Sequence, residues 1–126
     1  MSNQELGPTL LIVDDDDMVR EAIQRMLLQL GYQTIAASSG EEALEIYESS
    51  QTPIGAVILD VTMPGLSGIQ TFHRLREIDT QVRVIVSTGD PYSPAVAEIE
   101  AQNLTNVIAK PFQAEELARA IQQALS

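Results

Sequence analysis

Five short apolar runs alternate with longer segments of helical period along the chain, and this alternation is the strongest constraint on its fold. Each run has the length of a buried strand, whereas the segments between the runs repeat their apolar residues at helical spacing. Strands that alternate with helices in this way form parallel sheets, because each helix carries the chain back to the start of the next strand. The pattern predicts an α/β fold with five strand-helix pairs and strands at Leu10–Val13, Gln33–Ala37, Ile54–Leu59, Val82–Val86 and Asn106–Ala109.

The helix after the first strand is predicted from its apolar face. Gly31 follows this face at the position where a left-handed helix cap is expected. Met18 and Met26 are predicted to lie in the core and not to act as sulfur ligands. The residues on the face are Val19, Ala22, Ile23, Met26, Leu27 and Leu30.

The remaining helices are predicted from the residues at their ends. Serine followed three residues later by Glu or Gln is typical of a capping box, and proline suits the first turn of a helix. Asn103 is predicted to take the left-handed turn that ends the fourth helix. The predicted helix starts are Ser39 with Glu42, Ser67 with Gln70, Ser93-Pro94 and, for the last helix, Gln113.

The chain is short and strongly acidic. It has 126 residues with 18 Asp and Glu against 7 Lys and Arg, so its formal net charge is -11 at pH 7. This charge repels nucleic acid phosphates and anionic lipid, so neither is predicted as a direct partner. The length and a hydrophobic content of 44% predict one domain over residues 1–126. Because cysteine, a basic leader and a membrane-length apolar run are all absent, we predict a cytoplasmic protein.

Acidic residues, hydroxyl residues and one lysine directly follow four of the predicted strands. In a parallel α/β sheet, ligands bind beyond these carboxyl ends. Two carboxylates that face a third repel one another unless a cation joins them, and oxygen ligands without cysteine favour Mg²⁺. The residues are Asp14 to Asp17 after the first strand, Asp60 after the third, Ser87 and Thr88 after the fourth, and Lys110 after the fifth.

Several of these residues also have a purely structural interpretation. Asp16 and Asp17 suit the N-terminus of the first helix, where acids are favoured. Asp60 alone is consistent with a loop cap, but Lys110 is the only lysine in the chain and shares its sheet edge. A carboxylate nucleophile, a divalent cation and a lysine together favour phosphoryl transfer. Ser87 is predicted to be an inward-facing filler, because neighbours on a strand point to opposite faces.

Four short motifs occur in order along the chain: Ile12-Val13-Asp14-Asp15-Asp16, Leu59 to Gly68, Val86-Ser87-Thr88-Gly89 and Ala109-Lys110-Pro111-Phe112. Together they resemble the receiver domains of bacterial two-component response regulators, and the resemblance extends from Leu10 to Leu125. It implies a flavodoxin-like, doubly wound (βα)5 parallel sheet with strand order 2-1-3-4-5.

The resemblance implies a role for each matching residue. The phosphoryl group would be accepted by a carboxylate beside a bound Mg²⁺, and a hydroxyl and an ammonium group would contact its oxygens. The bond before Pro111 would be cis, which is an arrangement that only X-Pro bonds adopt readily. The implied roles are Asp60 as phosphoacceptor, Asp14, Asp15, Asp60 and the backbone carbonyl of Thr62 as Mg²⁺ ligands, Thr88 as the hydroxyl, and Lys110 as the ammonium group.

The resemblance also implies partners. A histidine kinase or phosphotransfer protein would supply the phosphoryl group, and a downstream effector or a second copy would bind the surface of the fourth helix, fifth strand and fifth helix. The family often has an aromatic residue three positions before the lysine, and its ring moves inward after phosphorylation. This chain has Val107 there, so an aromatic response at that position is excluded. The domain would act in signalling, with no enzymatic activity except its own phosphorylation and slow dephosphorylation on Asp60.

Two alternative functions remain at this point. A Mg²⁺-dependent aspartyl phosphatase shares the nucleophile but typically needs a second Asp two residues later, where this chain has Thr62. A flavodoxin-like cofactor binder needs a Ser/Thr/Gly phosphate loop after the first strand, where this chain has four aspartates. These residues argue against both alternatives.

Overall fold

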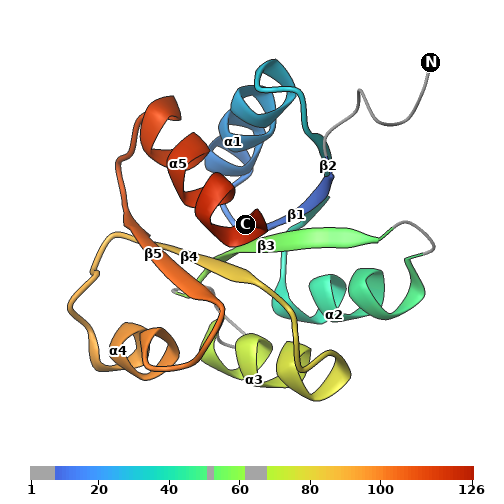
Figure 1. The fold of residues 1–126 in the computed structure, drawn as a ribbon, viewed down its shortest axis with the longest axis vertical. Helices are drawn as coiled ribbons and strands as arrows, with labels where there is room; N and C mark the ends of the chain where they lie inside the picture. Colours follow the sequence, from blue (N-terminus) through green and yellow to red (C-terminus); the bar gives the residue numbers. More distant parts are fainter. Residues whose placement is uncertain (1–7, 51–52, 62–67) are drawn as a thin grey trace.

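Five parallel strands run through the centre of the molecule in the order β2-β1-β3-β4-β5 (Figure 1). The computed structural model describes residues 8–50, 53–61 and 68–126. The predicted strand order 2-1-3-4-5 is therefore confirmed, and the order of the strands reverses at β1. The strands are β1 (Thr9–Val13), β2 (Gln33–Ala37), β3 (Ile54–Asp60), β4 (Val84–Thr88) and β5 (Thr105–Ala109).

The helices cover both faces of the sheet. In Figure 1, α1 and α5 lie on one side of the strands, and α2, α3 and α4 lie on the other. We call the first side the α1/α5 face. The helices are α1 (Asp17–Gln29), α2 (Gly40–Ser49), α3 (Gly68–Ile78), α4 (Pro94–Glu100) and α5 (Ala114–Leu125).

Each face of the sheet has its own hydrophobic core, because neighbouring strand residues point to opposite sides. On the α1/α5 face, Ile12, Ile58 and Ile85 pack against Ile23 of α1 and Leu117 of α5. The core on the other side is built from the intervening strand residues and from α2, α3 and α4. Its buried members include Leu11, Val13, Leu59, Val86, Ala43, Phe72, Leu75, Val96 and Ile99.

The register of the strands brings their carboxyl ends to one edge of the sheet. Val13 of β1 pairs with Leu59 of β3, and Asp60 pairs with Ser87 of β4. Ser87 in turn pairs with Ile108 of β5. The polar residues that end these strands therefore meet at this edge.

The caps predicted at Asp16, Ser39, Ser93 and Gly31 are confirmed. Asp16 begins α1 by accepting hydrogen bonds from two helix amides at 3.0 and 3.3 Å. Ser39 accepts a bond from the Glu42 amide at 3.1 Å, and Ser93 caps α4 in the same way at 3.2 Å. Gly31 has φ +96° after α1. The predicted cap at Ser67 lies outside the described residues.

Two predictions about α1 are wrong. Met18 is 79% exposed and not part of the core, and Leu30 is 42% exposed. In the first turn of α1, Val19 and not Met18 packs against the core of the α1/α5 face. Leu30 is the residue that caps the other end of the helix. The middle of the predicted apolar face is buried as expected at Ile23 and Leu27.

The connections on either side of β4 also differ from the prediction. β4 begins at Val84 and not at Val82, because the Val82 amide donates to the Asp79 carbonyl in the turn after α3. The left-handed residue after α4 is Leu104, with φ +65°, and not Asn103. The Leu104 carbonyl accepts a bond from the Val84 amide at 3.0 Å, so this turn fixes the start of the β4-β5 pairing.

Candidate functional site

Three carboxylates gather at the carboxyl edge of the sheet. The pairing of Val13 with Leu59 places Asp14, which follows β1, beside Asp60 at the end of β3. Carboxylate oxygens of Asp14, Asp15 and Asp60 all lie within 4.8 Å of one another. Asp14 is 1% exposed and Asp60 3% exposed, whereas Asp15 is open to solvent. The structure therefore brings together three of the four predicted metal ligands.

The fourth predicted ligand, the backbone carbonyl of Thr62, lies outside the described residues. The described donors nevertheless suit a hard cation. All three offer oxygen, and two of them are buried carboxylates whose repulsion a divalent cation would relieve. Asp14, Asp15 and Asp60 therefore fit Mg²⁺.

The surroundings of Asp14 act in opposite directions on its ionisation. Burial is the largest effect and raises the pKa of the Asp14 carboxyl above its ordinary value, because the charged form loses solvation. The Asp16 amide donates to Asp14 Oδ1 at 2.9 Å, and this bond and Lys110 favour the charged form. The raised pKa means that the ionised group costs folding stability, and this cost develops as the pH rises from the unfolded-state pKa through the folded-state pKa.

Lys110 supplies the positive charge at the acidic edge. Its Nζ atom lies 3.0 Å from Asp14 Oδ2 and 3.6 Å from Asp60 Oδ2. The Lys110 amide donates to the Thr88 carbonyl at 2.8 Å, which extends the β4-β5 pairing beyond the end of β5. The bond between Lys110 and Pro111 is cis, as the resemblance implied. One ammonium group thus stands against three carboxylates.

Thr88 and Ser87 end β4 on opposite faces of the sheet. Thr88 is fully buried, and its hydroxyl oxygen accepts a bond from the Asp90 amide at 2.9 Å. Thr88 follows the alternation of Val86, which belongs to the core opposite α1 and α5. Ser87 lies on the α1/α5 face, which is also the face of Asp60 and Lys110. The prediction that Ser87 points inward is confirmed by its burial.

Arg20 also supports the candidate site, although no sequence motif predicted this role. Its Nη1 atom donates to the backbone carbonyl of Asp14 at 2.7 Å, and its Nη2 atom pairs with Asp17. The spacing of Asp17 and Arg20 on α1 indicates such a helical pair, but nothing local indicates the bond to Asp14. Arg20 therefore helps to fix the chain between β1 and α1.

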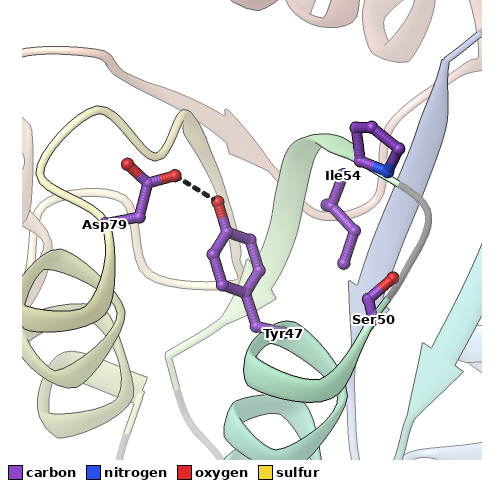
Figure 2. Close-up of a pocket in the computed structure, with 5 residues that line it drawn as sticks. Tyr47, Ser50, Ile54 and Asp79 are labelled. Atoms are coloured by element: carbon purple, nitrogen blue, oxygen red, sulfur yellow. Dashed lines mark hydrogen bonds between the residues drawn. The ribbon is translucent and has the colours of Figure 1, made fainter.

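A pocket of about 250 Å³ lies away from the acidic edge, near the amino ends of β3 and β4. Figure 2 shows the Tyr47 hydroxyl pointing at Asp79, to which it donates at 2.7 Å. Burial and this carboxylate raise the pKa of Tyr47 well above its ordinary value. The Gln81 amide also donates to Asp79, at 2.9 Å. The pair therefore joins α2 to the turn after α3 and does not belong to the candidate site.

Comparison with known proteins identifies the family of this chain. Residues 10–122 match the family described as the response regulator receiver domain. The chain belongs to this family. Receiver domains are signalling domains of two-component systems, and the fold and the acidic cluster Asp14, Asp15 and Asp60 agree with this assignment. The comparisons support neither the phosphatase nor the cofactor-binding alternative.

Two curated relatives that match this chain differ in length. The receiver is 32% identical over 120 residues to sporulation initiation phosphotransferase F of Bacillus subtilis, with 95% of each chain covered. It is 38% identical over 119 residues to the positive alginate biosynthesis regulatory protein of Pseudomonas aeruginosa, with 91% of this chain but only 46% of that protein covered. The chain thus spans about half the length of some relatives and nearly the whole length of others.

A solved structure shows the receiver fold with a metal ion and a partner. The solved complex of CheX, CheY, BeF3 and Mg²⁺ from Borrelia burgdorferi contains a chain that is 25% identical to this one, with a TM-score of 0.90. The comparison covers 98% of this chain and 93% of that chain. Receiver domains thus bind Mg²⁺ at an acidic site and associate with other signalling proteins.

Proposed function

We propose that residues 1–126 form a single receiver domain whose Asp60 accepts a phosphoryl group from a histidine kinase or a phosphotransfer protein. The observation that carries this proposal is the geometry around Asp60. This buried carboxylate lies within 4.8 Å of two further carboxylates and 3.6 Å from the ammonium group of Lys110. Asp14, Asp15, Asp60 and the Thr62 carbonyl hold the Mg²⁺ ion in this proposal.

Phosphoryl transfer at this site requires positioning and charge neutralisation more than covalent chemistry. An Asp60 carboxylate oxygen attacks the phosphorus, so an oxygen–phosphorus bond forms while the phosphorus–nitrogen bond of a donor phosphohistidine breaks. The electron pair of the broken bond stays on the donor nitrogen. When bound, Mg²⁺ supplies positive charge that offsets the carboxylates and the phosphoryl oxygens. Lys110 turns from Asp14 toward a phosphoryl oxygen, and the Thr88 hydroxyl bonds another.

An apolar groove beside Lys110 supports docking of the donor protein. The groove has a volume of about 410 Å³ and is lined by α1 residues together with Lys110 and Phe112. Met18, at the start of α1, adds an exposed apolar side chain near the acidic edge. A donor protein that covers this surface brings its phosphohistidine to Asp60. The acidic charge of the receiver disfavours nucleic acid as a direct partner.

Among the described residues, no helix combines the length and the apolar composition of a membrane span. We place the domain in the cytoplasm, where its kinase partners carry their phosphoryl groups. Its relatives differ in length. We therefore assign the downstream response to a partner protein, or to a further segment, that binds the phosphorylated domain.

Labelling with a small phosphodonor tests the proposal. We expect acetyl phosphate to add one phosphoryl group to the protein in Mg²⁺ and essentially none in EDTA, because the carboxylates repel the donor without a cation. Intact-mass measurement and the acid or base lability of the added group are the readouts. Equal labelling in Mg²⁺ and in EDTA would contradict the proposed site.

The proposed output surface comprises α4, β5 and α5. Val107 is half-buried and packs in the core beside α4, and its branched side chain has limited reach. His73 of α3 bonds Glu98 of α4 at 2.9 Å, so a shift of α4 breaks a specific contact. When Thr88 moves toward the phosphoryl group, we infer that backbone and α4 displacement fills the vacated space and shifts an existing equilibrium toward a partner-binding state.

A Val107→Tyr substitution tests this account of the output. We expect it to change self-association or partner affinity severalfold while leaving phosphorylation of Asp60 intact, because Val107 lies in β5 and not in the acidic cluster. Amide exchange of the wild-type protein with and without beryllofluoride locates the response. If protection changes stay confined to the loops around Asp60 and never reach α4, this account is wrong.

A further inference from the structure

Ser87 carries an unusual hydroxyl group. Its Oγ atom is the one buried side-chain oxygen or nitrogen without a hydrogen-bond partner in the part of the chain that the structure describes. Ser87 is 1% exposed, so bulk water does not solvate the hydroxyl. An unpaired buried polar group costs stability, and an apolar residue of similar size would avoid this cost.

The sheet places this hydroxyl next to Asp60. Ile58 of β3 pairs with Ile85 of β4, and both pack in the core of the α1/α5 face. Two residues later along the same strands, Asp60 pairs with Ser87, so both side chains lie on that face. Neighbouring strands are about 4.8 Å apart, which makes Ser87 an immediate neighbour of Asp60.

The strand order also places Ser87 on the path that the Lys110 side chain follows across the sheet. Lys110 follows β5, yet its ammonium group reaches Asp60 at the end of β3 and Asp14 beyond β1. Because β4 lies between β5 and β3, the lysine side chain must cross the end of β4. Lys110 lines the groove next to Ile23 of α1, so it crosses on the α1/α5 face, where Ser87 lies.

The hydrogen-bonding capacities of the two groups match. An ammonium group has three N–H donors and no acceptor, whereas a serine hydroxyl has two acceptor lone pairs. Asp14 accepts one ammonium hydrogen at 3.0 Å, and Asp60 at 3.6 Å is too distant for a normal hydrogen bond. Lys110 therefore has donor capacity to spare, and Ser87 has an unused acceptor on the same face of the sheet.

We propose that Ser87 is a positioning residue for Lys110. When Lys110 turns from Asp14 toward a phosphoryl group on Asp60, Ser87 Oγ accepts one of its ammonium hydrogens and holds the charge over the phosphoryl oxygens. This step involves no proton transfer and forms no covalent bond. The bond is absent in the unphosphorylated structure, so it is gained only as transfer proceeds, and such interactions accelerate a reaction. This inference rests on the proposed phosphoacceptor role of Asp60.

Four forms of the protein test the role of the hydroxyl. Ser87→Thr keeps the hydroxyl, Ser87→Val has the shape of threonine without it, and Ser87→Ala removes it without adding bulk. We expect acetyl phosphate to label the alanine and valine variants about tenfold more slowly than their hydroxyl counterparts, equivalent to about 1.4 kcal/mol. Mg²⁺ affinity, measured by calorimetry, should be the same in all four forms, because Ser87 is not a metal ligand.

A second arm separates positioning of Lys110 from packing. In a Lys110→Ala background, Ser87→Ala should neither slow labelling further nor weaken beryllofluoride binding further, because the group that it positions is gone. If Ser87→Ala slowed labelling as much in the Lys110→Ala background as in the wild type, the proposal would be overturned. It would also be overturned if the wild type and Ser87→Thr were not labelled faster than Ser87→Ala and Ser87→Val. If the wild type accepts no phosphoryl group in Mg²⁺, the phosphoacceptor assignment itself fails.

Discussion

Asp60→Asn is expected to leave no detectable transfer of a phosphoryl group from acetyl phosphate to the protein. Asparagine has nearly the same size as aspartate, but its amide is not a nucleophile of comparable strength, so the oxygen–phosphorus bond does not form. The variant should fold, because Asp60 is buried beside another carboxylate and losing its charge relieves repulsion. Intact-mass measurement in Mg²⁺, with circular dichroism to confirm folding, checks the prediction.

The matched control for this prediction is Glu100→Gln. Glu100 is an exposed carboxylate at the end of α4 and does not belong to the acidic cluster. Its replacement removes one negative charge without touching the site, and labelling should proceed at the wild-type rate. Labelling of Asp60→Asn at the rate of this control would mean that a different residue accepts the phosphoryl group.

Lys110→Ala is expected to separate metal binding from the response to a phosphoryl group. The lysine competes with a cation for Asp14, which lies 3.0 Å from its ammonium group, so Mg²⁺ affinity should be equal to or higher than that of the wild type. Binding of beryllofluoride should fall about a hundredfold, the loss typical when a charge that stabilises developing oxyanions is removed. Calorimetric titration with Mg²⁺, followed by titration with beryllofluoride, measures the two steps separately.

Lys110→Arg is the control that retains the charge. The planar guanidinium is longer and presents its donors in a fixed fork, so it should restore only part of the beryllofluoride affinity. If Lys110→Ala abolished Mg²⁺ binding while the fold survived, the ammonium group would have a role in the metal site that we have not given it.

Much of the fold follows from periodicity and end signals that act locally. The β2 prediction matches at both ends, and Ser93-Pro94 begins α4 because its hydroxyl and its fixed backbone angle act within one turn. The predicted strand ends are wrong where pairing with a neighbouring strand decides where a strand begins. Val82 has a strand-like side chain, but the pairing with β5 begins only at Val84, next to the turn at Leu104.

The candidate site was predictable to the extent that strand ends are predictable. Asp14, Asp60 and Lys110 follow apolar runs, and parallel strands bring such ends to one edge. The bond from Arg20 to the Asp14 carbonyl and the unpaired hydroxyl of Ser87 depend on relationships across the fold that the local pattern does not contain. Burial of Met18 was also overpredicted, because its spacing from Met26 does not show that Val19 is the residue of the first turn that packs against the core.

The most direct test of the account is to locate the phosphoryl group in the wild-type protein. After labelling with acetyl phosphate in Mg²⁺, reduction with borohydride converts an acyl phosphate to an alcohol, and peptide mass spectrometry identifies the altered residue. The account predicts that the altered residue is Asp60 and that the same peptide is unaltered when EDTA is present. A phosphoryl group on His73, on Asp14 or Asp15, or on any serine or threonine would contradict it.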